Sequence, residues 1–320
     1  MLSRVADAIY WMNRYIERAE NYARFMDVNF NLSLELSSGI SEQWRPLVVT
    51  TGDWALYESL YGKEKKDKII YFLAFDPENP NSIYNSITRS RENARAIRPE
   101  LTKEVWEQIN YLYYLVKDGL EKKRWKKNDP RNYFTEIKKG CQLVYGITDA
   151  TISRNDGWHF GKIGQLIERA DKTSRVLDVK YHMLLPTPEE VGSPFDIIQW
   201  ASLLKSVSAY DMYRKKNGKL TPIGISEFLI LDKIFPRSIL KCLTQTEQSL
   251  HIISGRTEGY SNNAEKQLGI LKSQLEYVDI QDIFEMGLHE YLDNFQKKLN
   301  ETSTAIFETF FSMENIINRN

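Results

Sequence analysis

A charged segment of fourteen residues occurs twice in the chain, and this repeat restricts the fold more than any other feature. The first copy, residues 15–28, reads YIERAENYARFMDV, and the second, residues 166–179, reads LIERADKTSRVLDV. The second copy begins 151 residues after the first and keeps the order of the charges. The matching residues are Glu17 and Glu168, Arg18 and Arg169, Glu20 and Asp171, Arg24 and Arg175, and Asp27 and Asp178. Such a match over so long a separation indicates one structural unit used twice.

Both copies predict α-helix, because they contain no proline or glycine and are rich in good helix formers. At about 100° per residue, the charges fall on one face and small or apolar residues on the opposite face. The polar face holds Asn13, Glu17, Glu20, Arg24 and Asp27 in the first copy and Glu168, Asp171, Arg175 and Asp178 in the second, with Arg14 and Asn21 at its edge. The opposite face holds Ile16, Ala19, Ala23 and Met26, and Ile167, Ala170, Ser174 and Leu177.

The matched charge order has two explanations. Surface ion pairs on two solvated helices would each contribute only about 0.3–0.5 kcal/mol and would not require the same order twice. Two helices that meet and interlock their glutamates and arginines, or that hold a ligand together, do require it. We therefore predict one shared, buried or half-buried Glu–Arg site. The repeat leaves open whether this site is a structural lock or a ligand site.

A third polar segment, residues 89–98, adds arginines that share a helix face and need acids or a bound anion to neutralise them. Glu17 or Glu168 would supply the acids, and a phosphate or carboxylate would bind the arginines in bidentate fashion. The candidate ligand-binding residues are Arg14, Glu17, Arg18, Glu20, Arg24, Arg91, Glu92, Arg95, Glu168, Arg169, Asp171 and Arg175, with Arg154 and Arg237 as further anion contacts. The catalytic candidates are Glu17, Glu168 and His159, although a structural hydrogen bond is the favoured role for the histidine.

Beyond the repeat, the chain resembles the alpha-E family, a predicted all-helical bacterial domain named for its Glu-Arg motif. The resemblance rests on MLSRVADAIYWMNRYIERAE at 1–20, WRPL at 44–47, TGD at 51–53, SRENAR at 90–95, WEQIN at 106–110, ISRNDGWHFG at 152–161, EFLILD at 227–232 and FPRSI at 235–239. It implies circularly permuted ATP-grasp and transglutaminase-like proteins as partners, and hence a role beside a peptide- or amide-forming system. Gln165 stands opposite Arg14 where the resemblance implies arginine, which breaks the symmetry of a four-arginine site.

The composition excludes several classes of function. The chain has 320 residues and carries 43 basic and 43 acidic side chains, so nothing in its net charge favours nucleic acid or an anionic membrane. There is no 18-residue apolar run, and the first residues lack the basic and long apolar regions of a signal peptide, so we expect neither a membrane span nor a signal peptide. Two cysteines cannot form a disulfide framework and suit a reducing cytosol, so we predict a cytoplasmic protein. A homo-oligomer is compatible with these properties.

Cofactor and metal motifs are also missing from the sequence. No nucleotide-binding glycine loop and no Glu-x-x-His pair occurs, so we predict neither a cofactor nor a metal. Three acid–histidine pairs have the helical i,i+4 spacing and offer metal ligands, although pairing at the surface is the commoner role of such residues. These pairs are Asp178 with His182, Glu247 with His251, and Glu285 with His289. The two cysteines, Cys141 and Cys242, are predicted to pack as small buried hydrophobic residues.

Helical periodicity runs through most of the chain, which predicts an all-α, multi-helix bundle with the two motif helices as its longest early and middle elements. We predict a single domain over 1–320, built from pseudo-repeated halves 1–154 and 155–320, with a linker near 186–194. Segment 66–75 is predicted as helix despite the strand propensity of IIYFL, and 121–130 as a solvated charged connector. Asn81 is predicted to cap the helix at 81–98, and Pro236 to start the helix at 236–255. Segments 195–216 and 281–316 are each predicted as one helix.

Three functions fit these features. The first is an accessory or binding protein of an ATP-grasp-type ligase system, with an Arg/Glu-lined cleft for an anionic ligand or partner. The second is an enzyme that uses Glu17 or Glu168 as general acid or base and arginines as an electrostatic clamp. The third is a purely structural ion-pair network. The first is favoured because the chain has no recognisable catalytic motif and because the resemblance to the alpha-E family implies an ATP-grasp-like partner.

Overall fold

The computed structural model describes residues 1–35, 44–126, 130–182 and 192–312 of the chain. These residues form fifteen α-helices and two short 3-10 helices and contain no strand, so the predicted all-α fold class is confirmed. No helix in this part of the chain has the length and hydrophobicity that a membrane span needs.

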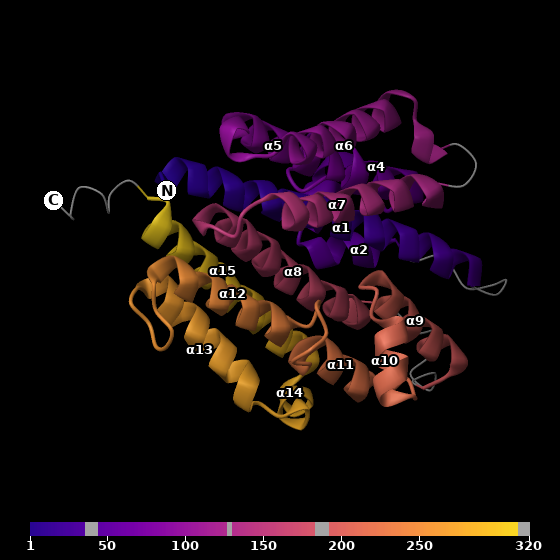
Figure 1. Ribbon diagram of the computed structural model, residues 1–320. Helices are drawn as coiled ribbons and strands as arrows, with labels where there is room; N and C mark the ends of the chain where they lie inside the picture. The colour runs from indigo at the N-terminus through magenta and orange to yellow at the C-terminus, as the bar shows by residue number, and fades with distance from the viewer. Residues whose placement is uncertain (36–43, 127–129, 183–191, 313–320) are drawn as a thin grey trace.

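Seven α-helices lie in the first half of the chain and eight in the second (Figure 1). The first seven are α1 (Ser3–Glu35), α2 (Arg45–Thr51), α3 (Trp54–Tyr61), α4 (Lys66–Ala74), α5 (Ile83–Ala96), α6 (Lys103–Glu121) and α7 (Arg131–Thr151), with 3-10 turns η1 (Arg98–Glu100) and η2 (Arg124–Lys126). The other eight are α8 (Asp156–His182), α9 (Pro194–Ser206), α10 (Tyr210–Asn217), α11 (Pro222–Leu231), α12 (Ile239–Ser254), α13 (Asn263–Tyr277), α14 (Ile280–Met286) and α15 (Leu288–Phe310).

Two segments predicted as single helices are broken in two. The segment 195–216 forms α9 and α10, and the turn between them includes Ser208 with a φ of 52°. The segment 281–316 forms α14 and α15, separated at Gly287, whose φ of 98° only glycine adopts readily. Residues beyond 312 lie outside the described part of the chain. The helical spacing of hydrophobic residues therefore continues in the sequence through a turn that separates two helices in the structure.

Two predicted helix starts were also wrong. Ser82, not Asn81, caps α5 by accepting a hydrogen bond from the Asn85 amide. Ser238 caps α12 in the same way, so this helix begins after Pro236 and not at it. Most of the predicted linker lies outside the described residues, and Pro194 already belongs to α9.

The two ambiguous segments of the first half belong to the core. Segment 66–74 is the helix α4, as predicted, because Ile69, Ile70, Phe72 and Leu73 are all buried on its inner side. The predicted solvated connector contains η2, whose Trp125 is buried and stacks on Phe75 with ring centroids 4.2 Å apart. The aromatic residue of this basic segment therefore packs inside the protein.

The motif helices α1 and α8 form the centre of the molecule and pack on each other more extensively than any other pair of described helices (Figure 1). In the first half, α5 and α7 pack on α1, and α6 contacts both. In the second half, α12 and α15 pack on α8, and α13 contacts both. Each half thus places three helices around its own motif helix.

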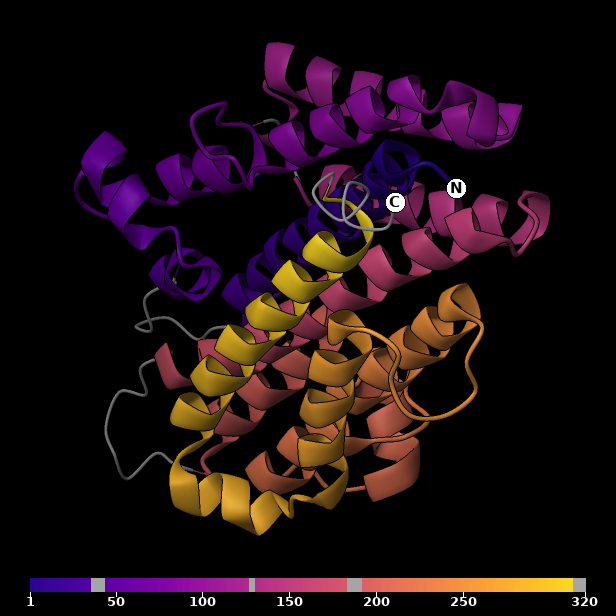
Figure 2. The same ribbon diagram turned by 90° about the vertical axis from the view of Figure 1, so that its left-hand side faces the viewer.

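Each half also packs one short helix against the motif helix of the other half. The helix that follows α1, α2, packs on α8, whereas the helix that follows α8, α9, packs on α1. In Figure 2 the start of α1 lies beside the end of α15, where the rings of Tyr10 and Phe311 are 5.3 Å apart. These crossed contacts tie the two halves together at both ends of the central pair.

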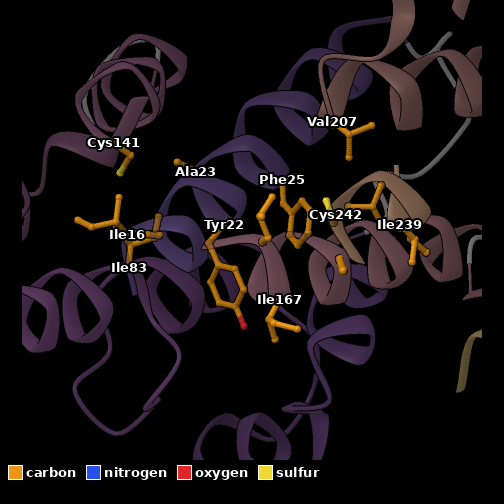
Figure 3. Packing of buried hydrophobic residues seen from close by; sticks show 14 of the residues in the cluster. Ile16, Tyr22, Ala23, Phe25, Ile83, Cys141, Ile167, Val207, Ile239 and Cys242 are labelled. Atoms are coloured by element: carbon orange, nitrogen blue, oxygen red, sulfur yellow. The ribbon is translucent and has the colours of Figure 1, made fainter. Parts of the chain in front are cut away.

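Both faces of the central helices are buried. The apolar faces pack into the hydrophobic core seen in Figure 3, where Ile16, Ala23 and Ile167 are fully buried. Along the contact between α1 and α8, glycines allow the backbones to approach closely. A Cβ atom on Gly164 would lie 2.3 Å from the Tyr10 carbonyl oxygen. The polar faces of the repeat are consequently largely shielded from bulk solvent, with the arginine side chains no more than 19% exposed, and their charged groups pair mainly with one another.

Candidate functional site

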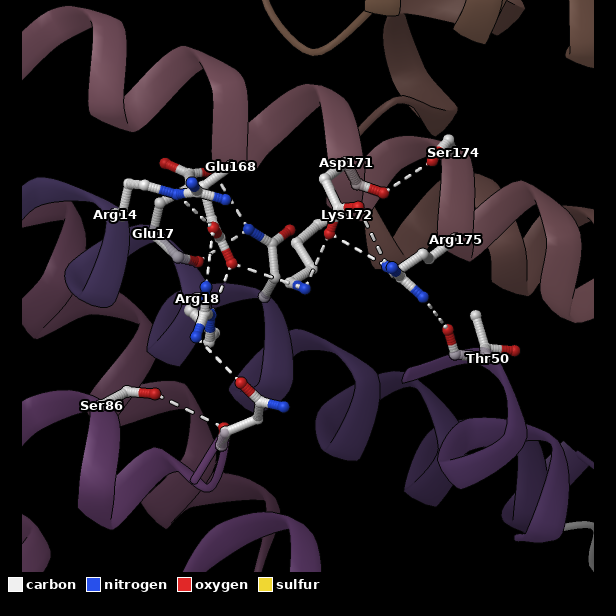
Figure 4. Close-up of polar contacts among 12 residues, drawn as sticks. Arg14, Glu17, Arg18, Thr50, Ser86, Glu168, Asp171, Lys172, Ser174 and Arg175 are labelled. Atoms are coloured by element: carbon white, nitrogen blue, oxygen red, sulfur yellow. Dashed lines mark hydrogen bonds and ion pairs between the residues drawn. The ribbon is translucent and has the colours of Figure 1, made fainter. Parts of the chain in front are cut away.

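The motif glutamates exchange arginines across the central helix pair. Arg18 of α1 donates to Glu168 of α8, from Nε to Oε1 at 2.6 Å and from Nη2 to Oε2 at 3.0 Å. Arg169 of α8 donates to Glu17 of α1, from Nε to Oε1 at 3.0 Å and from Nη2 to Oε2 at 2.8 Å. The pairs are bidentate, occupy equivalent positions of the repeat, and leave both glutamates fully buried. Figure 4 shows the pair formed by Arg18 and Glu168.

Glu168 also receives a donor from Arg14 of α1, and each glutamate has a further donor one turn away on its own helix. Arg14 Nε binds Glu168 at 2.9 Å, and Lys172 Nζ approaches Glu168 Oε1 at 3.4 Å. Asn21, which occupies the repeat position of Lys172, donates to Glu17 at 3.0 Å.

Glu17 lacks the counterpart of Arg14, because Gln165 stands at that position. A cation from another element takes its place: Arg237, which precedes α12, donates to Glu17 at 3.0 Å and to Glu20 at 2.8 Å. The asymmetry introduced by Gln165 is thus compensated within the same chain.

An outer pair of ion pairs extends the network along both helices. Arg24 binds Glu20 at 2.6 Å and donates to the Ser208 hydroxyl, which follows α9. Arg175 binds Asp171 at 3.0 Å and donates to the Thr50 carbonyl oxygen of α2 at 2.9 Å. Each outer arginine therefore reaches the short helix that the other half contributes. The last charged pair of the repeat, Asp27 and Asp178, lies outside the network.

The electrostatics of the network keep Glu17, Glu168 and Asp171 ionised. Burial alone would raise the pKa of Glu17, but the charges of Arg169 and Arg237 outweigh it and hold the pKa well below its ordinary value. Burial is likewise overcome at Glu168, where Arg18, Lys172 and Arg14 lower the pKa. At Asp171, burial opposes the charges of Lys172 and Arg175, which lower the pKa to about 2.

Cations outnumber carboxylates in the network. The cations are Arg14, Arg18, Arg24, Arg169, Lys172, Arg175 and Arg237, and the carboxylates are Glu17, Glu20, Glu168 and Asp171. One carboxylate oxygen, Glu20 Oε2, has no hydrogen-bond partner among the described residues. The cluster therefore carries a local positive excess, with seven cations against four carboxylates.

The structure brings together nine of the predicted ligand-binding residues: Arg14, Glu17, Arg18, Glu20, Arg24, Glu168, Arg169, Asp171 and Arg175. The third polar helix, α5, stays apart. Arg91 donates to Asn110 of α6 at 2.7 Å and lies over the Tyr113 ring, and exposed Arg95 pairs with Glu92 of the same helix. The expectation that Glu17 or Glu168 neutralises these arginines is therefore wrong, since Glu92 does so.

His159 lies in the interface between α8 and α12. Its Nδ1 is 3.3 Å from the Ser249 hydroxyl, and burial lowers the pKa of the ring, which favours the neutral form. This matches the structural hydrogen bond that the sequence favoured. Arg154, a predicted anion contact, lies over the Trp158 ring at 4.4 Å.

Two connecting-segment residues complete the network: Arg237, which the sequence indicated only as an anion contact and not as a partner of the glutamates, and Asn81, which it indicated only as a helix cap. Arg237 immediately precedes the cap Ser238, and Asn81 immediately precedes the cap Ser82. Asn81 Oδ1 accepts from Arg18 Nη1 at 2.8 Å. The two residues hold equivalent places in the two halves, but their side chains differ, so no repeat is visible there. The signal that could have found them is the shared serine cap.

A pocket lies beside the network, where the start of α8 meets α1 and α7. It is lined by Asn13 and Met12 of α1, Tyr145, Thr148 and Asp149 of α7, Trp158, Lys162 and Gln165 of α8, and Glu100 and Leu101 before α6. Lys162 Nζ donates to Gln165 at 3.1 Å, and burial together with the charge of Arg169 lowers the pKa of the lysine. The buried Thr148 hydroxyl has no partner among the described residues. The pocket thus offers polar groups that a ligand can use.

Comparison with known proteins identifies relatives without a known activity. The chain is 24% identical over 277 residues to an uncharacterised protein of Mycobacterium bovis and to two uncharacterised proteins of Mycobacterium tuberculosis strains. The alignment covers 79% of this chain but 30% of each relative, so the chain spans less than a third of the length of the curated relatives it matches. Comparison with solved structures gives no significant match. Residues 1–311 match the Alpha-E family, described as a predicted alpha-helical domain with a conserved ER motif, and the chain therefore belongs to that family.

Proposed function

We propose that the chain is an accessory binding protein of an ATP-grasp-type peptide or amide ligase system, and that its Glu–Arg network organises the binding surface without taking part in chemistry. The single observation that carries this is the pairing of Glu17 and Glu168, each of which is bound by arginines of this chain. A carboxylate already saturated by two or more cations of its own chain has no free position for a substrate.

The same pairing argues against acid–base catalysis by the two glutamates. A general acid or base works best when its pKa lies near the operating pH. Arginine charges hold the pKa of Glu17 and of Glu168 far below neutrality. At pH 7 these groups would be without a proton to donate and would be weak bases.

The pocket beside the network is the proposed binding region. It places the ammonium of Lys162 against a wall that also carries the carboxylates of Asp149 and Glu100, with Trp158 as an apolar surface. Opposite charges in one pocket suit a ligand that carries both a carboxylate and an ammonium, as a peptide or amino acid does. The positive excess of the neighbouring network favours the carboxylate end.

The test uses the full chain, an ATP-grasp-like protein encoded beside it, and a panel of short acidic peptides. We expect the chain to retain the ATP-grasp-like protein in affinity capture and to bind at least one peptide by calorimetry. Lys162→Gln should weaken peptide binding by about tenfold or more, since a charge-assisted contact is lost. Lys103→Gln, an exposed lysine of α6, is the matched control and should change nothing.

Two results together would reject the proposal: capture that recovers no ATP-grasp-like protein, and a folded chain that binds no peptide. Turnover of a substrate that disappears in Glu168→Gln, with the fold intact, would favour the stand-alone enzyme instead.

We further propose a cytoplasmic location. Cys141 and Cys242 are free and buried, and burial raises the pKa of both thiols, in the case of Cys242 to about 12. Such thiols are poor nucleophiles and remain reduced without harm in a reducing compartment. Localisation of a tagged full-length protein by fractionation tests this.

A further inference from the structure

Three metal-ligand side chains converge where the end of α8 meets the start of α15. They are Asp178 and His182, one turn apart on α8, and His289 on α15. In sequence, His182 and His289 belonged to different acid–histidine pairs more than a hundred residues apart. The fold joins them because α15 packs along α8.

The geometry of the cluster is compact. Asp178 Oδ1 is 2.6 Å from His289 Nδ1, and Asp178 Oδ2 is 4.0 Å from His182 Nε2. One ligand atom from each of the three residues lies within 4.8 Å of the others. Asp178 is buried and the two histidines are half-buried, so the cluster is enclosed on one side and reachable from the other.

The position of His289 is fixed by a second contact. Its ring stacks on Tyr181 with centroids 4.1 Å apart and planes within 6° of parallel. Tyr181 lies next to His182 on α8, so this stacking holds the two histidines near each other. A preset arrangement of this kind lowers the ordering cost of binding.

We propose that Asp178, His182 and His289 form a binding site for a divalent first-row metal ion, with Zn²⁺ as the best match. Imidazole nitrogen and carboxylate oxygen are ligands that Zn²⁺ takes in proteins, and three protein ligands leave a fourth tetrahedral position for water. Ligand atoms bound about 2.0–2.2 Å from the metal lie about 3.3–3.6 Å apart. The Asp178–His289 separation of 2.6 Å therefore has to lengthen by up to about 1 Å, and the Asp178–His182 separation of 4.0 Å has to shorten by up to about 0.7 Å. No ligand atoms of the cluster, all within 4.8 Å of one another, have to approach by more than about 1.5 Å. Rotation of half-buried rings accommodates that change.

The other two acid–histidine pairs do not form such a site. Glu247 pairs with Lys272 at 2.7 Å, and His251 Nε2 lies 3.1 Å from the Gly259 carbonyl oxygen. Glu285 and His289 share the spacing, but His289 Nδ1 faces Asp178 instead. The i,i+4 spacing alone therefore did not predict which acid–histidine residues form a cluster. The cluster forms only where α15 packs against α8 and brings His289 next to Asp178 and His182.

A metal ion bound at this site would link the C-terminal end of α8 to the start of α15. This is the opposite end of α15 from the contact between Tyr10 and Phe311. Metal binding should then stabilise the folded chain, because a ligand that binds only the folded state raises the apparent melting temperature.

The test uses the full chain without a polyhistidine tag, freed of metal by chelation. We expect calorimetry to show one Zn²⁺ per chain, and Co²⁺ to give visible absorption typical of a tetrahedral site. Asp178→Asn and His289→Ala should each weaken Zn²⁺ binding by about 100-fold or more and abolish the Zn²⁺-dependent rise in melting temperature. His251→Ala, a histidine outside the cluster, is the matched control and should bind Zn²⁺ as the wild type does.

Either of two results would overturn the proposal. One is the absence of stoichiometric Zn²⁺ or Co²⁺ binding to the folded wild type, which would leave the cluster as an Asp–His hydrogen bond. The other is wild-type affinity in His289→Ala, with circular dichroism showing an intact fold, which would place the bound metal elsewhere.

Discussion

At the Glu17 carboxylate, donors from three parts of the chain meet: Asn21 of α1, Arg169 of α8, and Arg237 before α12. The carboxylate has been removed from water, so its desolvation is offset only while these donors remain in place. A buried pair of this kind adds little stability compared with a hydrophobic replacement, but the loss of one partner leaves the others as uncompensated charges. The cost of a single substitution should therefore be large.

Replacing Glu17 or Glu168 with glutamine should lower the free energy of unfolding by about 3–5 kcal/mol, because the facing arginines stay buried without a counter-charge. Chemical denaturation at pH 7 measures this. The control is Glu92→Gln on α5, whose carboxylate is exposed and pairs with Arg91 and Arg95 of the same helix, and it should change stability by less than about 0.5 kcal/mol. If the buried and the exposed substitutions lowered the free energy of unfolding equally, the buried network would not be what stabilises the contact between α1 and α8.

Acid should destabilise the chain through the same carboxylates. The pKa values of Glu17 and Asp171 are lower in the folded state than their ordinary values of 4.5 and 3.8, so the folded state resists protonation and the unfolded state takes up protons first. The stability they contribute is present above about pH 4.5 and falls as the pH drops towards the folded-state pKa of about 2 at Asp171. Denaturant midpoints measured from pH 7 to below 3 should decline less in Glu168→Gln than in the wild type. Parallel curves would contradict this.

At the residue scale, the sequence predicted that the glutamates and arginines of the two motif helices would pair. It did not predict which residues outside the motif would complete the network. The charge repeat placed Glu17, Arg18, Glu168 and Arg169 together because an equal order on two helices requires that they meet. Arg237 lies in a connecting segment without periodicity, where sequence separation gives no measure of distance. The repeat also could not distinguish an open cleft from a network closed by its own arginines, since both need the same residues.

At the scale of helices, the close contact between α1 and α8 depends on a short stretch with small residues. Gly161 and Gly164 face α1, where a Cβ atom would meet Asn13 Nδ2 at 2.7 Å and the Tyr10 carbonyl oxygen at 2.3 Å, respectively. Side chains can rotate away, but a backbone carbonyl oxygen cannot. The separation of the central helices is therefore set most strictly at Gly164.

Gly164→Ala should destabilise the chain by about 1–3 kcal/mol, because the added methyl group forces the two central backbones apart. Gly146→Ala in α7 is the matched control: the added Cβ meets nothing within 4 Å, and the substitution should be neutral or stabilise by up to about 1 kcal/mol through helix propensity. Thermal melts of both variants make the comparison. A Gly164→Ala protein as stable as the control would mean that the central helices can shift freely.

Helix positions were predicted well where periodicity and caps agree, and poorly where a hydrophobic stripe continues through a turn. Thr102 caps α6, and its hydroxyl accepts a hydrogen bond from the Val105 amide. By contrast, α14 and α15 keep their apolar residues in phase across Gly287, so the sequence pattern shows no break. The backbone conformation of a single residue determines where such a helix ends. The spacing of hydrophobic residues gives no information about that conformation.

At the scale of the whole molecule, the crossed contacts make the halves dependent on each other. Each half buries the carboxylates of the other, and α2 and α9 cover the opposite motif helix. A half separated from its partner would expose unpaired glutamates and arginines on the face of its central helix. A single domain over 1–320 stays a prediction, and the charges shared between α1 and α8 are the physical argument for it.

The full chain should unfold in one cooperative transition. Trp44 and Trp125 report on the first half and Trp200 on the second, and all three are buried. Single-tryptophan variants followed by fluorescence should give the same midpoint as circular dichroism in a denaturant titration. Two separated midpoints, one for each half, would contradict interdependence.

The reciprocal exchange of arginines between α1 and α8 also bears on ancestry. A precursor with one motif helix could bury its glutamate only by associating with an identical molecule, as a two-fold symmetric homodimer does. Fusion of two such copies would preserve the reciprocal pairs and free the remaining positions to diverge independently. Arg14 and Gln165 occupy equivalent positions in the two halves but differ in residue type, and so do Asn81 and Arg237, as expected after such a fusion. Both differences lie at the edge of the network, whose central Glu–Arg pairs still follow the two-fold symmetry.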